Sequence, residues 1–143
     1  MRPVLFDSSI YVTALRAADE TVLGLRRIAS EAPLWLSAVV LEELYAGVRR
    51  RDRKVVERLE RDFNRARRIL VPTLTDWTRA GQALSLLAAE YGYEEIGQGR
   101  LTNDALIAMS AGRQGITLIT ANERDFARLQ KVRPFQFEVA PRV

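Results

Sequence analysis

Polar side chains at the ends of apolar segments are the groups in this sequence that could carry out a reaction. The first is Asp7, which directly follows a short apolar run, and Glu43, Asp104, Asn122 and Asp125 come later. The chain has no cysteine and no histidine, which removes thiolate and imidazole chemistry. A site with only oxygen ligands favours Mg²⁺ or Mn²⁺ over zinc or copper. These residue types therefore indicate metal-assisted hydrolysis, provided that the fold brings them together.

The apolar pattern predicts the elements that would gather these side chains. Apolar runs at Val4–Phe6, Leu34–Leu36 and Ile116–Ile119 are typical of buried parallel strands. Segments with helical periodicity separate them, and alternating strands and helices predict an α/β fold with a parallel sheet. Because the carboxyl ends of parallel strands share one edge of the sheet, we expect the five polar side chains to meet there.

Further boundaries follow from turn and capping signals. Ile69–Val71 is predicted as a short strand or connector, Gly92–Leu101 as a loop, and Phe135–Val139 as a last, edge strand. The predicted helices are Ser8–Arg16 with a continuation over Val22–Ala29, Val39–Arg50 capped by Ser37, a helix from Thr75 or Asp76 to about Tyr91, a helix capped by Thr102 or Asn103 with Asp104 in its first turn, and Asn122–Leu129 capped by Asn122.

Each candidate acid also has a purely structural explanation. Asp7 could cap the helix that follows it, in competition with Ser8. Glu43 could form a solvated pair with Glu42, and an acid such as Asp104 at the start of a helix interacts favourably with the helix dipole. The residue pattern alone leaves these alternatives open.

Basic residues concentrate in one segment, Arg49–Arg68, which holds ten basic and four acidic residues in a chain of net charge +4. Apolar residues keep a helical period through the segment, so we expect a packed helix with a basic outer face. Arg58 and Arg65 are candidates for contacts with phosphates. A solvated face with pairs such as Glu57 and Arg61 is the alternative.

Length and composition limit the class of protein. A chain of 143 residues with 48% apolar residues fits a single domain, 1–143, with a sizeable core. No apolar run approaches the roughly 20 residues of a membrane span, and the N-terminus lacks the pattern of a signal peptide. We therefore expect a cytoplasmic protein that does not associate with membranes.

Four short motifs occur in order along nearly the whole chain. They are D-S-S at Asp7–Ser9, E-L-Y-A-G at Glu43–Gly47, N-D-A-L-I-A at Asn103–Ala108 and T-A-N-E-R-D-F at Thr120–Phe126. Each motif alone is weakly specific, but together they make the chain resemble PIN-domain proteins. Within that family the resemblance is to the VapC-type toxins of bacterial and archaeal toxin–antitoxin pairs.

The resemblance implies a PIN-like three-layer α/β/α sandwich with a five-stranded parallel sheet, and a Mg²⁺- or Mn²⁺-dependent endoribonuclease activity. The first three acids of the family correspond to Asp7, Glu43 and Asp104, which are the implied metal ligands. Its fourth polar position falls on Asn122 or on Asp125.

The resemblance also implies supporting residues and partners. Thr120 would be a supporting hydroxyl, and Ser8 or Ser9 would position water or phosphate. If the basic face of the Arg49–Arg68 segment contacts RNA phosphates, Arg58 and Arg65 would be RNA-binding residues. Proteins of this type usually form homodimers and are silenced by a cognate antitoxin, which gives heterotetramers or larger assemblies.

Three other interpretations fit less well or differ in activity. A phosphatase of the haloacid-dehalogenase type needs a second Asp where Ser9 stands, and a receiver domain needs a lysine that neither Lys54 nor Lys131 supplies. The stronger alternative is a PIN-like module that binds RNA or protein without cleaving it, which a measurement of Mg²⁺ or Mn²⁺ affinity would distinguish.

Overall fold

Five short strands form one sheet in the computed structural model, which describes residues 2–17, 33–96 and 100–140. Their order across the sheet is β3-β2-β1-β4-β5, and every pairing is parallel. The predicted α/β fold with a five-stranded parallel sheet is therefore confirmed, with β5 at an edge. The strands are β1 (Val4–Phe6), β2 (Leu34–Ser37), β3 (Ile69–Leu70), β4 (Thr117–Thr120) and β5 (Phe137–Val139).

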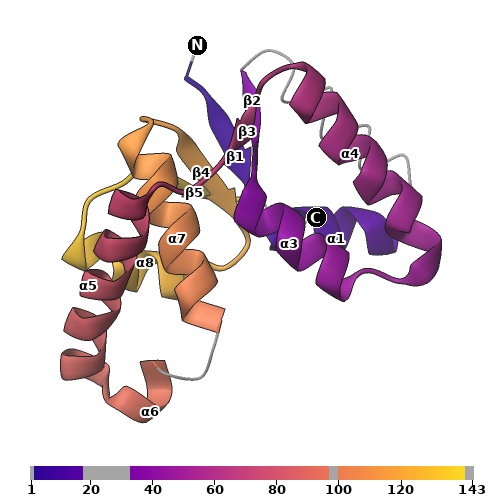
Figure 1. The fold of residues 1–143 in the computed structure, drawn as a ribbon. Coiled ribbons are helices and arrows are strands. Elements are labelled where there is room, and N and C mark those ends of the chain that lie inside the picture. The colour runs from indigo at the N-terminus through magenta and orange to yellow at the C-terminus, as the bar shows by residue number, and fades with distance from the viewer. Residues whose placement is uncertain (1, 18–32, 97–99, 141–143) are drawn as a thin grey trace.

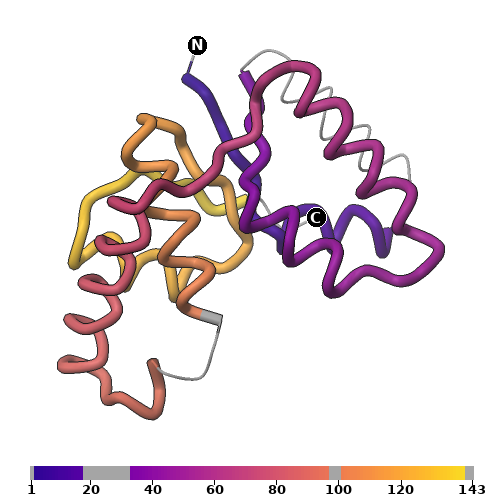
Figure 2. The backbone as a smooth tube through the Cα atoms, in the orientation of Figure 1, coloured from indigo at the N-terminus to yellow at the C-terminus, as the bar shows by residue number. Residues whose placement is uncertain are grey.

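Helices cover both faces of the sheet, as the ribbon in Figure 1 and the backbone tube in Figure 2 show. Helices α1, α3 and α4 lie on one side, and α5, α7 and α8 pack together on the other. None of the helices within the described ranges is long and apolar enough to cross a membrane. The helices are α1 (Ser8–Ala17), α3 (Ala38–Gly47), the 3₁₀ turn η2 (Arg50–Asp52), α4 (Arg53–Arg65), α5 (Leu74–Tyr91), α6 (Tyr93–Ile96), α7 (Arg100–Arg113) and α8 (Glu123–Val132).

The core lies between the sheet and its two helical layers. Leu5, Leu36 and Leu118, one from each of the three central strands, are completely buried. The middle of α7 is buried throughout residues 105–111 and packs against β4, so the prediction of a central apolar helix is confirmed. This arrangement brings the carboxyl ends of β1, β2 and β4 to one edge of the sheet, where the candidate site lies.

The basic segment 49–68 is not one helix. Helix α3 ends at Gly47, because Val48 leaves helical geometry with ψ at 153°. A 3₁₀ turn follows, in which Asp52 is buried and accepts a hydrogen bond from Nε of Arg49 at 2.9 Å. Helix α4 then begins at Arg53 and turns Val56, Leu59 and Phe63 inward, as the helical period of the segment predicted.

Three other predicted boundaries are wrong. Thr73, rather than Thr75 or Asp76, caps α5, because its side chain and that of Asp76 bond reciprocally to each other's backbone N–H. Tyr93–Ile96 forms the short helix α6 inside the predicted loop. Helix α7 begins at residue 100, upstream of the predicted cap at Thr102 or Asn103, and its Leu101 is buried in the core. The helix predicted over residues 22–29 lies outside the described residues.

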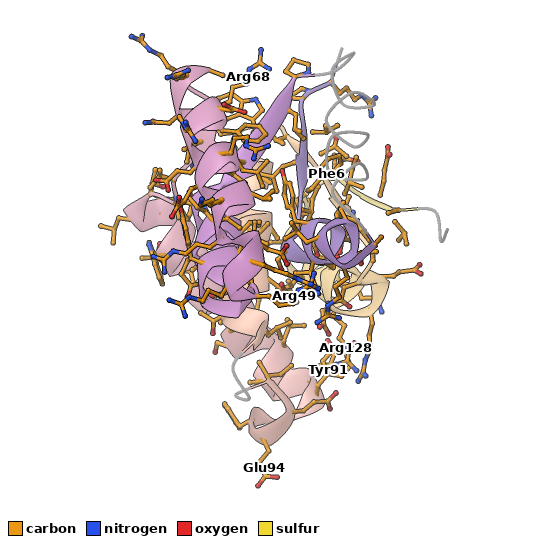
Figure 3. All side chains as sticks on the ribbon, turned by 90° about the vertical axis from the view of Figure 1, so that its right-hand side faces the viewer. Phe6, Arg49, Arg68, Tyr91, Glu94 and Arg128 are labelled. Carbon is orange, nitrogen blue, oxygen red and sulfur yellow. The ribbon has the colours of Figure 1, made fainter. Side chains whose placement is uncertain are left out.

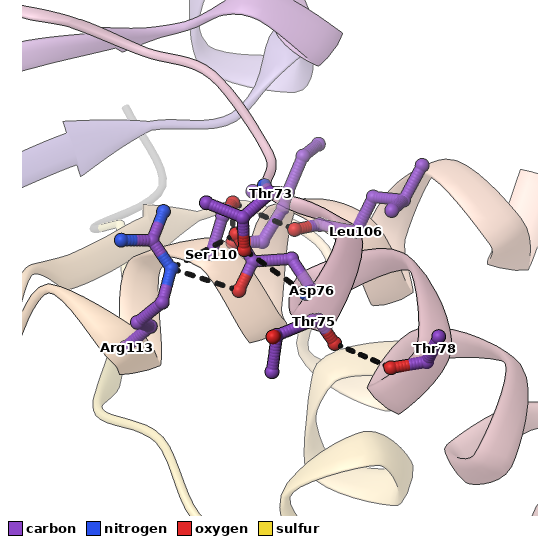
Figure 4. Close-up of polar contacts among 8 residues, drawn as sticks. Thr73, Thr75, Asp76, Thr78, Leu106, Ser110 and Arg113 are labelled. Carbon is purple, nitrogen blue, oxygen red and sulfur yellow. Dashed lines mark hydrogen bonds and ion pairs between the residues drawn. The ribbon is translucent and has the colours of Figure 1, made fainter.

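A buried ion pair joins α5 to α7 (Figure 4). The Asp76 carboxylate is completely buried and accepts two hydrogen bonds from Nε of Arg113, each 3.0 Å long. Burial alone would raise the pKa of Asp76, but the hydrogen bond and charge of Arg113 and the backbone N–H of Thr73 outweigh it and lower this pKa. The pair therefore ties the N-terminal turn of α5 to the last turn of α7.

Candidate active site

Asp7 lies at the carboxyl end of β1, as the sequence predicted, and its side chain is only 4% exposed. Its backbone N–H still belongs to the sheet, because it donates to the carbonyl of Ile119 at 3.1 Å. The carboxylate accepts hydrogen bonds from the backbone N–H of Ser9 at 3.1 Å, from the Ser9 hydroxyl, and from the Thr120 hydroxyl at 2.5 Å. The bond from Ser9 N–H is the local turn that starts α1.

Two hydroxyls fix the orientation of the Asp7 carboxylate. The oxygen of Ser9 accepts from the backbone N–H of Ala121 at 3.2 Å, and that of Thr120 accepts from the N–H of Asn122 at 2.9 Å. Each hydroxyl therefore donates to Asp7 while it accepts from the chain that leaves β4. Burial raises the pKa of Asp7, and the bonds from Ser9 and Thr120 partly oppose this rise. The ends of β1 and β4 thus hold one buried carboxylate in a single position.

Glu43 lies on α3, the helix that follows β2. Ser37 caps this helix as predicted, since its hydroxyl accepts from the backbone N–H of Val39 at 3.1 Å and of Val40 at 3.4 Å. The Oε1 atom of Glu43 is buried and has no hydrogen-bond partner among the residues that the structure describes. This is an unusual state for a carboxylate oxygen, because an unsatisfied buried acceptor is costly.

The pKa of Glu43 is raised. Burial is the main cause, hydrogen bonding to Asn103 and Ser8 lowers the pKa, and repulsion by Asp7 and Glu42 raises it further. The influence of Asp7 on the pKa of Glu43 indicates that the two carboxylates lie within electrostatic range of each other. Their membership of one catalytic site stays a prediction.

Helix α7 contributes the third predicted acid. Helices α3 and α7 pack together, and Nδ2 of Asn103 lies 3.5 Å from Oε2 of Glu42. Asp104 is half-buried beside Asn103, but it lies beyond the first turn of α7, so the predicted dipole position is wrong. From the sequence, Asn103 was only a candidate cap. Its place next to Asp104 in the N-D-A-L-I-A motif is the sequence feature that could have indicated a position beside Glu42 and Glu43.

The side chains of Asn122 and Asp125 hydrogen-bond to each other. Asn122 stands at the N-cap position of α8, but its side chain does not cap the helix. Instead its Nδ2 donates to Oδ2 of Asp125 at 3.1 Å, while its backbone N–H donates to the Thr120 hydroxyl. The Thr120 hydroxyl also donates to Asp7, so Thr120 links the Asn122–Asp125 pair to the Asp7 carboxylate.

The donor set fits a hard cation at Asp7 and Glu43. Over residues 2–17, 33–96 and 100–140, no group of three acidic side chains is close enough to hold a metal ion. The unpartnered Oε1 of Glu43, beside a second buried carboxylate, is nevertheless the kind of ligand that Mg²⁺ and Mn²⁺ prefer. A role for Asp104 in the same site stays a prediction.

The two candidate arginines of the basic segment lie on helix α4, which carries none of the candidate acids. Arg58 and Arg65 are both exposed on α4, so the prediction that they point outward is confirmed. Figure 3 labels Arg49 and Arg68 near the two ends of this segment, with nitrogen-tipped side chains along its outer side. The structure thus provides a basic helix face, and nucleic-acid contact there stays a prediction.

The family described as PIN domain matches residues 4–132 of the chain. A comparison with curated protein sequences gives no significant match.

Several solved structures have a similar fold at low sequence identity. One is DNA-bound VapBC from Salmonella typhimurium, with TM-score 0.69, 20% identity, and coverage of 97% of this chain and 98% of that chain. VapBC2 from Rickettsia felis, bound to a promoter DNA fragment, has TM-score 0.59 and 20% identity over 97% and 99%. FitAB bound to the IR36 DNA fragment has TM-score 0.64 and 18% identity over 95% and 94%. At these identities the likeness concerns the fold.

Proposed function

The chain belongs to the PIN-domain family, and we propose that it is a metal-dependent endoribonuclease that acts as the toxin of a toxin–antitoxin pair. PIN domains are generally nucleases that use divalent metal ions. The proposal includes three specific features: the RNA substrate, the metal requirement and the role as a toxin.

One observation carries the proposal, which is the buried Oε1 atom of Glu43 without a hydrogen-bond partner among the described residues. An enclosed carboxylate oxygen with no donor lowers stability, and the neighbouring Asp7 carboxylate adds repulsion. A structural role would favour an apolar or amide side chain at this position. A binding role for a cation accounts for both carboxylates, because their charge is then compensated.

Asp7 and Glu43 would hold the metal ion, with Asp104 as the third ligand. When bound, a divalent ion neutralises charge on the scissile phosphate and lowers the pKa of water near it. The hydroxyls of Ser9 and Thr120 keep the Asp7 carboxylate in one orientation, so that little reorganisation is needed on binding. Asn122 and Asp125 support this arrangement through the backbone N–H that Asn122 donates to Thr120.

The absence of histidine from the sequence supports water as the attacking group. Attack by the 2′-hydroxyl of RNA usually needs an acid–base pair that titrates near neutral pH. We therefore propose that water attacks phosphorus, that the bond from phosphorus to the 3′-oxygen breaks, and that this oxygen takes a proton from solvent. The products carry a 3′-hydroxyl and a 5′-phosphate.

The proposed partners rest on the structural relatives. VapBC from Salmonella typhimurium and VapBC2 from Rickettsia felis have the same fold over nearly the whole chain. We propose that this chain likewise binds a cognate antitoxin in the cytoplasm, forms a homodimer, and assembles with the antitoxin into a heterotetramer or a larger complex.

A binding module without activity is the competing function. It is favoured by one observation, which is that no three acids in the described parts of the chain stand close enough to share a metal ion. Such a module would bind RNA or protein equally well with or without a divalent ion.

The deciding experiment is cleavage of single-stranded RNA in Mg²⁺, in Mn²⁺ and in EDTA, with mass spectrometry of the fragment ends. We expect cleavage only with a metal ion. Asp7→Asn, Glu43→Gln and Asp104→Asn should each lower the rate by about 100-fold or more, because each removes part of a stabilisation worth several kcal/mol. Glu42→Gln is the matched control, since Glu42 is the exposed neighbour of Glu43 on the same helix.

The outcomes separate the two functions. Cleavage that persists in EDTA, or fragments with a 2′,3′-cyclic phosphate, would contradict the carboxylate and metal chemistry. A protein that binds RNA but leaves it intact in both metals would be the binding module.

A further inference from the structure

Two arginines lie close together on α8, the helix that begins after Asn122 and carries Asp125. Nη2 of Arg124 and Nη1 of Arg128 each donate to Oε1 of Glu95 on α6, both at 2.9 Å. Two guanidinium groups thus converge on one oxygen atom of a single carboxylate. We call these three side chains the α8–α6 cluster. It has one more positive than negative charge, and the surplus favours the approach of another anion.

The two arginines of the cluster are held with different firmness. The side chain of Arg128 is only 18% exposed, and its guanidinium carbon lies 4.0 Å from the centre of the Tyr91 ring (Figure 3). The side chain of Arg124 is 69% exposed. The pKa of Glu95 is lowered mainly by the hydrogen bond and charge of Arg128, and less by those of Arg124. Arg124 can therefore exchange Glu95 for another anion while Arg128 keeps its place.

The first turn of α8 connects the cluster to the candidate site. The Thr120 hydroxyl that donates to Asp7 also accepts from the backbone N–H of Asn122, and Arg124 follows two residues later. Asp125, the next residue, accepts from the Asn122 side chain. Figure 1 shows α6 beyond the carboxyl ends of the strands, the edge of the sheet at which the acids lie. The cluster thus borders the site on the side of α6 and α8.

We propose that Arg124 binds a phosphate of the RNA strand next to the scissile phosphate, and that Glu95 holds its guanidinium in place until the strand binds. A strand whose scissile phosphate lies at the acids has further phosphates on both sides. Arginine suits such a phosphate, because its planar fork can donate two parallel hydrogen bonds. This inference rests on the proposed function, and it adds a substrate-binding residue beside the site, apart from Arg58 and Arg65 on α4.

A purely structural contact between α8 and α6 is the other explanation for the cluster. Exposed ion pairs contribute little to stability, so such a contact is a weak reason to direct two arginines at one exposed carboxylate. A structural role of Arg124 would affect thermal unfolding and leave RNA affinity unchanged. A substrate-binding role would do the reverse.

Fluorescence anisotropy with single-stranded RNA tests the contact, with Glu43→Gln as the background that does not cleave. We expect Arg124→Gln to weaken binding by about tenfold, the effect of a lost hydrogen bond between charged groups. The slope of log affinity on log salt should flatten by about 0.7. Glu95→Gln should tighten binding by about two- to fivefold, because it removes the anion that competes for Arg124. Arg79→Gln is the matched control, since Arg79 is exposed on α5, 12 residues or about 18 Å before Tyr91.

Uncharged phosphates locate the contact. In a set of oligonucleotides, each phosphate in turn is replaced by a neutral methylphosphonate. At one position this change should weaken binding to the Glu43→Gln background by about tenfold. It should leave binding to the Arg124→Gln variant of that background nearly unchanged, because the phosphate then has no partner to lose. Equal losses in both proteins at every position would overturn the proposal.

Cleavage by the single variant Arg124→Gln separates this inference from the proposed function. In Mg²⁺ we expect KM to rise about tenfold with kcat nearly unchanged, because the contact is present before and during the reaction. A wild-type protein that cleaves RNA, together with an Arg124→Gln variant of equal KM and a lower Tm, overturns the contact alone. A protein that shows the methylphosphonate coupling but whose wild-type form does not cleave overturns the proposed function alone.

Discussion

At the scale of single residues, the candidate site holds two buried carboxylates that differ in their hydrogen bonding. Asp7 accepts hydrogen bonds from two hydroxyls and a backbone N–H, which partly compensate its burial. Glu43 has a buried oxygen that no described residue hydrogen-bonds. The pKa of both groups is raised by burial, so that both are stabilised by a proton or a cation nearby.

The raised pKa of Glu43 predicts how stability depends on pH without metal. The ordinary pKa is 4.5, so in the window above 4.5 the folded protein binds more protons than the unfolded chain. The free energy of unfolding should therefore fall as pH rises through the raised pKa. In urea titrations in EDTA between pH 4 and pH 8, Glu43→Gln should show a shallower fall and higher stability at the upper end. The gain should stay below about 1.4 kcal/mol, because solvent screens a half-buried carboxylate.

Two comparisons test this explanation. Glu90→Gln should follow the wild-type curve, because Glu90 is exposed on α5 and is not among the groups that shift the pKa of Glu43. If Glu43→Gln ran parallel to the wild-type curve at every pH, Glu43 would not be the source of the dependence. Addition of Mn²⁺ should stabilise the wild-type protein and leave Glu43→Gln nearly unchanged, since ligand binding to the folded state alone raises stability.

Among the helices and strands, the position of α7 matters most for the site, because α7 carries Asn103 and Asp104. The Asp76–Arg113 pair fixes one end of α7 to α5. Toward the other end of α5, Arg128 of α8 lies 4.0 Å over the ring of Tyr91 and shares Glu95 of α6 with Arg124 (Figure 3). The layer of α5, α6, α7 and α8 is thus joined by charged contacts as well as by its apolar core.

Removal of Arg113 should destabilise the fold strongly. Arg113→Gln leaves the Asp76 carboxylate buried without its charged partner, which typically costs about 3–5 kcal/mol. The lowered pKa of Asp76 means that its contribution is present above 3.8 and lost as pH falls through the lowered value. In Arg113→Gln this loss should begin at a higher pH. Arg79→Gln, an exposed change on α5, should alter urea unfolding by less than about 0.5 kcal/mol. An equal effect of both changes would show that the ion pair adds no stability.

Across the whole molecule, charge is distributed unevenly. The net charge of +4 hides a basic outer face on α4 and a sparsely charged one on α5. The acidic candidate site lies at the carboxyl edge of the sheet between the two helical layers. A polyanion that approaches the site would be attracted by α4.

The basic face of α4 predicts the salt dependence of RNA binding. With Glu43→Gln as a background that does not cleave, we expect Arg58→Gln and Arg65→Gln to weaken binding uniformly across sequences. The slope of log affinity on log salt should flatten by about 0.7 for each lost contact with a single strand. Arg2→Gln is the control, because Arg2 is exposed before β1, at the amino end of the sheet. An unchanged slope would assign the α4 face to solvent or to a protein partner.

Local sequence patterns were sufficient to predict the fold class and much of the chemistry. Short apolar runs and helical periods correctly predicted the parallel strands, the central α7 and the cap at Ser37. The position of Asp7 after β1 follows from the same patterns, because a strand and the residue that ends it are neighbours in the chain. The lack of histidine and cysteine needs no structure to limit the site to oxygen ligands.

Long-range packing, in contrast, controls how the polar side chains are satisfied. The bonded residues Asp7 and Thr120 lie 113 positions apart in the chain, and Asp76 and Arg113 lie 37 apart. Such contacts depend on how layers pack, which local patterns do not encode. The Thr73 capping box was readable from its spacing, whereas the orphaned oxygen of Glu43 was not. Whether a buried carboxylate meets a donor, an arginine or another carboxylate is determined only when distant segments come together.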